Sequence, residues 1–331
     1  MTIVTVHHAF TDWMKSRAPR KDSEHTKRAY RNDVETVAHI MARQKGETDP
    51  SWESLRVSDV TTHALRGAFA EFSEEHSAAS IARAQSTWRG LCKFCVQEGW
   101  LPGDPMAGVV QARVPKRLPK PLRGEEATAA QLLQFLAQGG RRDVKDPWPE
   151  RDYAVIATLL FTGVRSAELR GLTCGDIFGV PGEQRVRVLG KGNKERSIPV
   201  EAPLMAIITE YLESRRERFR RWNMTPTCPL FVDTDNEALT ATQLRWLVSR
   251  CLRQAGLGSA PQPGALVHAF RSTYATLIAA QGATAVEIMQ LLGHESLNTS
   301  QGYIKAVATE VRASAAANPL YRHLNMTEMP E

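Results

Sequence analysis

Four short segments between residues 162 and 305 contain side chains that could cleave a phosphate diester. These side chains are two arginines, two lysines, two histidines and a tyrosine: Arg165, Lys191, Lys194, His268, Arg271, His294 and Tyr303. Phosphoryl transfer needs cations for the non-bridging oxygens, a proton donor for the leaving oxygen and a nucleophile. Two arginines can hold the phosphate charge, and the sequence has no tight Asp/Glu cluster of the kind that binds Mg²⁺. The set therefore predicts phosphate chemistry without a metal or other cofactor.

The two arginines lie in different predicted surroundings. Arg165 follows a glycine turn in TGVRSAEL, at the start of a short helix, where free N–H groups and the guanidinium would both face an anion. Arg271 lies in an otherwise apolar helix, three residues after His268 and on the same face. Burying an arginine there is costly unless it is paired or serves a ligand. The alternative for Arg165 is an ordinary surface position, and for Arg271 it is a core ion pair with Glu168 or Glu287.

The two lysines lie in the turn of a predicted β-hairpin. Apolar and charged residues alternate in RVRV and again around SIPV, and GKGNKE between them suits a tight turn. Lys191 and Lys194 would lie at or near the hairpin tip, where an ammonium could reach a phosphate oxygen. The alternative is a polar turn exposed to solvent.

The last of the four segments runs from LLGHES to TSQGYIK and carries His294 and, nine residues later, Tyr303. A tyrosine near a helix start is ordinarily part of the core or a hydrogen-bonding corner. Tyr303 is a candidate nucleophile only because of the other six side chains.

The elements that must position these residues fall into two regions. Residues 1–110 predict a small all-α domain, with helix caps at Asp22-Ser23 and Thr61-Thr62 and a buried stripe from Ile81 to Cys95. That stripe includes a lone C-x-x-C pair, Cys92 and Cys95, which we interpret as helix core because no second pair completes a zinc site. Five cysteines, an odd number, also argue against a disulfide framework.

Residues 111–124 form a proline-rich, basic linker between the two regions. No acidic residue occurs from Arg113 to Arg123. Such a segment is typical of a solvated linker, and it could also follow a phosphate backbone. The candidate DNA-binding residues here are Arg113, Lys116, Arg117 and Lys120.

Residues 125–310 predict a larger domain of helices around the one hairpin, so the expected fold class is mainly α with a small β-sheet (α+β). Residues 311–331 form an Ala-rich tail that could dock on a neighbouring protomer or on its own domain. The net charge of +6 permits a polyanionic partner without requiring one. No apolar stretch is long enough for a membrane helix, and the N-terminus does not resemble a secretion signal, so we expect a cytoplasmic protein.

In this order and at these spacings, the motifs resemble those of the tyrosine recombinases, the phage integrase and Xer class of site-specific recombinases. The residues that carry the resemblance are Arg165 in TGVRSAEL, Lys191 in GKGNKERSIPV, His268 and Arg271 in HAFR, His294 in LLGHES, and Tyr303 in TSQGYIK. The resemblance is strong over about residues 125–310 and only architectural over the N-terminal helices. One departure is Phe270, where the family more often has leucine.

The resemblance implies that Arg165, Arg271 and His294 hold the scissile phosphate of double-stranded DNA, with Glu168 orienting an arginine. It also implies an N-terminal core-binding domain that closes on the DNA with the catalytic domain.

For the reaction, the resemblance implies that the hydroxyl of Tyr303 attacks phosphorus to give a 3′-phosphotyrosine. Lys191 would protonate the departing 5′-oxygen, although Lys194 lies close enough to be the alternative, and His268 would assist proton movement at the tyrosine. Neither ATP nor a metal would be needed.

For partners, the resemblance implies a homo-tetramer on two DNA sites, monomeric or dimeric when free, at the nucleoid, with accessory DNA-bending or directionality proteins as further partners. Three alternatives share some of these features: a type IB topoisomerase or telomere resolvase, a catalytically inert DNA-binding relative, and a metal hydrolase that uses the two histidines. The filled catalytic positions and the GKGNKER hairpin favour the recombinase.

Overall fold

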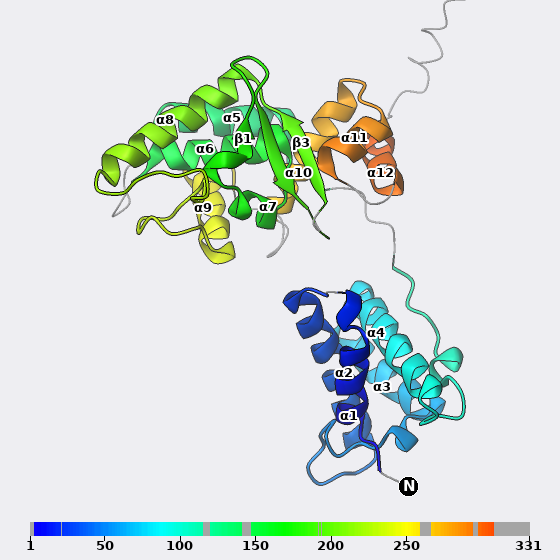
Figure 1. The fold of residues 1–331 in the computed structure, drawn as a ribbon. Coiled ribbons are helices and arrows are strands. Elements are labelled where there is room, and N and C mark those ends of the chain that lie inside the picture. Colours follow the sequence, from blue (N-terminus) through cyan, green and yellow to red (C-terminus); the bar gives the residue numbers. More distant parts are fainter. Residues whose placement is uncertain are drawn as a thin grey trace, which may run out of the picture. The chain divides into compact units, whose positions relative to one another are not determined.

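The computed structural model describes residues 3–20, 22–114, 120–140, 147–190, 192, 194–258, 266–293 and 297–307. The chain forms two compact units, Met1–Lys116 and Arg117–Glu331 (Figure 1). In the described part of the chain, no helix is both long and apolar enough to cross a membrane.

The regular elements in the described part of the first unit are helices. Its α-helices are α1 (Val6–Ser16), α2 (Glu24–Gln44), α3 (Thr62–Glu75) and α4 (Ala78–Gln97), with short 3-10 helices at Ala18–Arg20, Val57–Asp59 and Pro105–Gly108. The predicted caps are confirmed, because the hydroxyls of Ser23 and Thr61 accept hydrogen bonds from backbone N–H groups in the first turns of α2 and α3. Cys92 and Cys95 are buried in the core, as predicted, and burial raises the pKa of Cys95 to about 12.

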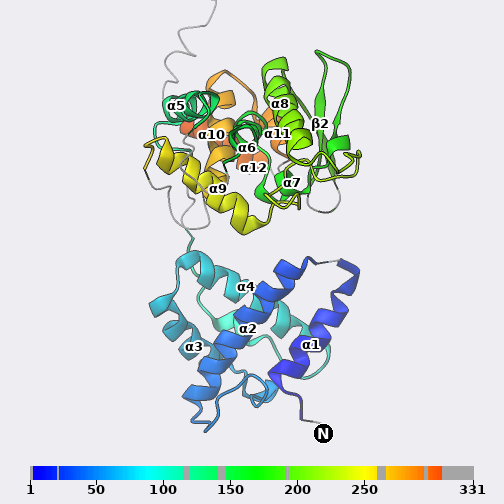
Figure 2. The ribbon, with the colours of Figure 1, turned by 90° about the vertical axis from the view of Figure 1, so that its left-hand side faces the viewer.

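The second unit has nine helices, among its described residues, and one small sheet. The helices are α5 (Glu125–Ala137), α6 (Pro149–Thr162), α7 (Ser166–Gly171), α8 (Ala202–Arg218), α9 (Ala241–Gln254), α10 (Leu266–Ala280), α11 (Ala285–Leu292), α12 (Leu297–Val307) and the 3-10 helix Cys174–Asp176. Helix α6 is buried along most of its length and packs against α5, α8, α9 and α10 (Figure 2). The predicted fold class, mainly α with a small β-sheet, is confirmed.

The sheet is antiparallel, with strand order β1 (Ile177–Phe178), β2 (Arg185–Leu189) and β3 (Glu195–Pro199). The hairpin prediction is confirmed for β2 and β3, and β1 adds a third strand that the sequence analysis did not predict. Val186 pairs with Ile198 and Val188 pairs with Arg196. Because residues that pair directly share one face of a sheet, Arg196 lies on the same face as the buried valines. Strand β3 contacts α11 (Figure 1).

Candidate active site

Three of the predicted chemical segments meet at the C-terminal end of helix α11. Arg165 is the residue immediately before α7, and its Nη2 donates to the carbonyl of Gly293 at 3.1 Å. Arg271, in α10, donates to the carbonyls of Gly163 at 2.8 Å and Leu292 at 2.6 Å. We call Arg165 and Arg271 the arginine clamp. They are 106 residues apart in sequence (271 − 165), and α11 brings them together.

Glycines at two helix ends make this approach possible. Gly163 ends α6 with a φ of +61° and Gly293 ends α11 with a φ of +62°, a left-handed conformation that favours glycine. A Cβ at Gly163 would lie 2.5 Å from Cδ1 of Tyr274 and 2.7 Å from Cδ2 of Leu292. A side chain there would therefore separate α6 from α10 and α11, and the clamp would open.

Arg271 is buried to 1% exposure, and within the described part of the chain it pairs with backbone carbonyls rather than with a carboxylate. The alternative of a core ion pair with Glu168 or Glu287 is therefore wrong for the contacts observed, because the carbonyls at two helix ends accept from its guanidinium instead. Burial lowers the pKa of Arg271 to about 10, and the charge of Arg165 acts in the same direction. The guanidinium still carries its positive charge at neutral pH.

Arg165 keeps 41% of its side chain exposed, although it is held on two sides. Besides its bond to Gly293, its Nη1 donates to Oε1 of Glu168 at 2.7 Å, and its backbone N–H donates to Oε2 of the same carboxylate at 2.7 Å. The exposed part can meet a ligand while Glu168 holds the rest in place.

Glu168 is the buried acceptor that organises this side of the site. Its side chain is 5% exposed and also accepts two hydrogen bonds from Arg196, at 2.9 and 2.7 Å. Burial alone would raise its pKa, but the hydrogen bonds from Arg196 and from the backbone of Arg165 outweigh burial and lower the pKa to about 2.

The lowered pKa of Glu168 predicts a pH-dependent contribution to folding. A carboxyl with a lowered folded-state pKa stabilises the fold fully above its ordinary pKa of 4.5, and the contribution disappears as the pH falls from there to about 2. Glu168→Gln should therefore reduce the free energy of unfolding by about 3 kcal/mol at pH 7. In urea titrations, we expect the difference between the two proteins to shrink as the pH is lowered to 3. Glu213→Gln, on an exposed part of α8, is the control. A difference that does not change with pH would contradict the assignment.

His268 lies one turn before Arg271 on α10 and is exposed. Partial desolvation lowers the pKa of its imidazole, and the positive charges of Arg271 and Arg165 act in the same direction. The ring is therefore neutral at pH 7 and able to accept a proton. A hollow of about 280 Å³ is lined by His268 and both clamp arginines, together with Arg245 of α9.

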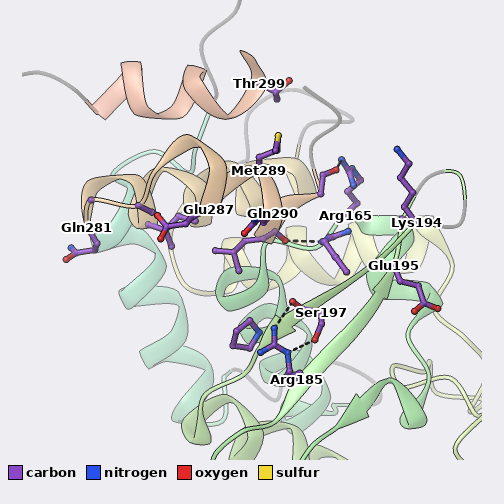
Figure 3. Close-up of a pocket in the computed structure, with 18 residues that line it drawn as sticks. Arg165, Arg185, Lys194, Glu195, Ser197, Gln281, Glu287, Met289, Gln290 and Thr299 are labelled. Carbon is purple, nitrogen blue, oxygen red and sulfur yellow. Dashed lines mark hydrogen bonds between the residues drawn. The ribbon is translucent and has the colours of Figure 1, made fainter. Parts of the chain in front are cut away.

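Arg165 also lines a larger groove, of about 1520 Å³. Lys194, directly before β3, is exposed and lines this groove with Arg165 (Figure 3). Lys191 lies outside the described residues. Arg165 is therefore shared by a hollow that His268 lines and a groove that Lys194 lines.

Tyr303 lies in the middle of α12, not near a helix start as the sequence analysis predicted, because α12 already begins at Leu297. It is 3% exposed and belongs to a buried apolar cluster with Ala275, Ile288 and Leu292. Its phenol is close enough to Arg271 to affect the pKa of that guanidinium. Tyr303 lies in a helix that packs on both α10 and α11, and its phenol is within electrostatic range of Arg271.

The structure describes only some of the remaining predicted site residues. His294 directly follows Gly293 and lies outside the described residues, as do Lys116 and Arg117. Arg113 and Lys120 are described, and both are exposed. Among the residues that the structure describes, no group of three His, Cys, Asp or Glu side chains could hold a metal ion.

The sequence analysis missed one residue of the site, Arg196. It lies in the GKGNKER segment, two residues after Lys194, and its guanidinium binds Glu168 and the carbonyl of Leu291, the latter at 2.9 Å. The signal was present in the strand pattern: Arg196, Ile198 and Val200 alternate, so the arginine occupies a position on the inward face.

Comparisons with known proteins find relatives over most of the chain. The phage integrase family matches residues 124–310, and the phage integrase N-terminal SAM-like domain matches residues 17–99. A tyrosine recombinase XerC of Neisseria meningitidis serogroup C is 29% identical over 298 residues, which are 89% of this chain and 90% of that protein. A tyrosine recombinase XerC of Myxococcus xanthus is 32% identical over 285 residues, 85% of this chain and 87% of that protein.

Solved structures share the fold at low sequence identity. A XerH site-specific recombinase bound to a palindromic difH substrate has a TM-score of 0.69 and 19% identity, over 95% of this chain and 84% of that one. A lambda integrase dimer bound to a COC′ core site has a TM-score of 0.64 and 20% identity, over 93% of this chain and 79% of that one. With the match over residues 124–310 and the Myxococcus relative, the chain belongs to the phage integrase family, the tyrosine recombinases.

Proposed function

We propose that this protein is a site-specific DNA recombinase that cleaves and rejoins double-stranded DNA through a 3′-phosphotyrosine bond to Tyr303. The observation that carries the proposal is the meeting of Arg165 and Arg271 at the end of α11, with Tyr303 packed against the same helix. Two guanidinium groups and a phenol at one place are what metal-independent transfer of a phosphoryl group requires.

In this proposal, the scissile phosphate binds at the exposed part of Arg165, between the hollow and the groove. The arginine clamp stabilises the charge that develops on the non-bridging oxygens in the transition state, with His294 as a further donor. Glu168 holds Arg165 in place, so little reorganisation is needed during the reaction.

The phenolic oxygen of Tyr303 attacks phosphorus and gives up its proton to the neutral imidazole of His268, directly or through water. The bond from phosphorus to the 5′-oxygen breaks, and a lysine of the hairpin protonates that oxygen to give a free 5′-hydroxyl. The product ester keeps the energy of the original phosphodiester, so a 5′-hydroxyl from a partner strand can reverse the step without ATP or a metal.

Strand exchange would need four protomers on two duplexes. A lambda integrase tetramer bound to a Holliday junction shares the fold of this chain, with a TM-score of 0.64, which supports the proposal without extending it to the contacts between protomers. The tail, residues 311–331, remains a candidate for docking on a neighbouring protomer, and Arg113, Lys116, Arg117 and Lys120 remain candidate contacts to the DNA backbone.

The experiment that tests the function is the capture of covalent adducts. Purified protein is incubated with DNA from the regions flanking its gene, in excess EDTA, and the mixture is denatured in SDS. We expect protein bound to the 3′ side of a defined cleavage site, with recombinant products when two sites are present. Specific binding without any adduct would instead indicate an inert relative, and relaxation of supercoils without exchange would indicate a topoisomerase.

Lys191 and Lys194 can be separated with a DNA substrate that has sulfur at the 5′-bridging position. Lys191→Ala should slow cleavage of ordinary DNA by about 10²- to 10⁴-fold, because a general acid is lost. A leaving sulfur needs no proton, so the same variant should cleave the sulfur substrate at nearly the wild-type rate. Lys194→Ala should show a smaller defect that is similar on both substrates. If only Lys194→Ala is rescued by sulfur, Lys194 is the general acid.

A further inference from the structure

Three arginines donate to three successive backbone carbonyls at the end of α11. Arg196 binds the carbonyl of Leu291, Arg271 binds that of Leu292, and Arg165 binds that of Gly293. Two of these arginines form the clamp, and the third comes from the lysine hairpin. We propose that Arg196 is a positioning residue that fixes the hairpin, and with it the general-acid lysine, against the arginine clamp. The inference rests on the proposed function.

The contacts of Arg196 reach three parts of the site at once. Its Nη1 and Nη2 donate to the two oxygens of Glu168 at 2.9 and 2.7 Å, and its Nε donates to Leu291 at 2.9 Å. Glu168 in turn holds Arg165. A single side chain thus connects β3, the start of α7 and the end of α11.

The packing around this guanidinium leaves little freedom. The side chain of Arg196 is 10% exposed. A Cβ at Gly293 would lie only 3.1 Å from Cδ and Nη1 of Arg196, so the glycine that ends α11 also makes room for the arginine. The Cβ of a side chain at Gly190, where the hairpin turn begins, would lie 3.7 Å from Nη1 of Arg196 and 3.8 Å from Oε1 of Glu168. Gly190 therefore lies close to the pair of Arg196 and Glu168.

Compared with an apolar pair of the same size, the pair of Arg196 and Glu168 contributes orientation more than stability. A desolvated ion pair gains little net free energy over an apolar pair of the same size, because both charges lose their hydration. A bidentate arginine, however, fixes distance and angle together, and its third nitrogen can bind a carbonyl at the same time. A lysine ammonium has no planar group with two parallel N–H donors. The unfavourable desolvation of this pair is explained if the reaction needs the hairpin in one fixed position.

The hairpin is short enough for this restraint to reach its lysines. Lys194 is two residues before Arg196, and its carbonyl accepts a hydrogen bond from the N–H of Gly190 at 2.8 Å, which closes the turn. A displacement of about 1 Å in a reacting group can slow an enzyme by about 10²-fold. Loss of Arg196 should thus act on the protonation of the leaving oxygen.

The test compares three variants of the full chain. Arg196→Met removes the guanidinium and keeps an unbranched side chain. Arg196→Lys keeps the positive charge without the two parallel N–H donors of the guanidinium. Arg187→Met is the matched control, because Arg187 lies on the opposite face of the same hairpin, half exposed and paired with Asp176 at 3.0 Å, away from the clamp. Amide hydrogen exchange is measured in the free protein, and single-turnover cleavage is measured on ordinary DNA and on the 5′-sulfur substrate.

We expect exchange in β2, β3 and the last turn of α11 to become at least about 10-fold faster in Arg196→Met and to stay unchanged in Arg187→Met. Cleavage of ordinary DNA should fall by about 10²-fold in Arg196→Met and by at least about 10-fold in Arg196→Lys, with DNA affinity nearly unchanged. On the sulfur substrate, both defects should shrink to about 3-fold or less, since no proton is needed there.

Unchanged exchange in Arg196→Met would overturn the inference whatever the activity. An equal loss of cleavage on both substrates would also overturn it, because the defect would then lie in the clamp or in folding. A wild-type protein that forms no adduct on either substrate would overturn the proposed function itself. An active wild type with an unimpaired Arg196→Met variant would overturn only the role of Arg196.

Discussion

Tyr303→Phe should abolish the covalent DNA adduct while leaving the affinity for DNA within about 3-fold, because the change removes only the nucleophilic oxygen. The ring can keep its packing against Ala275, Ile288 and Leu292, so the helices α10, α11 and α12 should stay together. The measurement is adduct yield in SDS with a nicked DNA that traps the cleaved state, alongside a binding titration. We expect adduct below the limit of detection.

Tyr274→Phe is the matched control for this experiment. Tyr274 is a partly buried tyrosine of α10 that packs against the same apolar cluster, and burial raises the pKa of its phenol. This variant should still form the adduct in good yield. An adduct that persists in Tyr303→Phe and disappears in Tyr274→Phe would show that the nucleophile has been misassigned.

Removing either arginine of the clamp should slow cleavage by at least about 10³-fold, since each substitution takes a charged donor from the transition state. Of the two variants, Arg271→Ala should lose more cleavage activity and more stability. Arg271 is almost fully buried, and without it the carbonyls of Gly163 and Leu292 lose a donor in the interior. Arg165→Ala should change the stability less, because 41% of that side chain is already exposed. Single-turnover cleavage rates measure the effect, and melting temperatures identify a folding defect.

Arg271→Lys keeps this prediction testable if the alanine variant does not fold. Lysine retains the positive charge but cannot donate to the carbonyls of Gly163 and Leu292 in the same planar geometry. We expect a folded protein that cleaves at least about 10²-fold more slowly than the wild type. Near-normal cleavage by Arg271→Lys and by Arg165→Ala would mean that other groups stabilise the transition state. Arg187→Ala, outside the site, should cleave normally.

The sequence by itself determined much of this protein, because its local signals are strong. Caps such as Ser23 and Thr61 fixed helix starts through side-chain hydrogen bonds within one turn. The alternation around GKGNKE fixed the hairpin, since a period of two residues is typical of a strand with one buried face. The order of the chemical motifs identified the family, because several unrelated short segments rarely occur together by chance.

Only the tertiary structure decided how the charged side chains are paired. The sequence left Arg271 with two carboxylates as alternatives, and the structure gave it two helix-end carbonyls instead. It also revealed Arg196, which no motif had distinguished from a surface arginine. The physical reason is that these partners are distant in sequence: Arg271 and Gly163 are 108 residues apart, and Arg196 and Leu291 are 95 apart. Periodicity and capping describe neighbours along the chain, whereas these contacts exist only after α6, α11 and β3 have packed together.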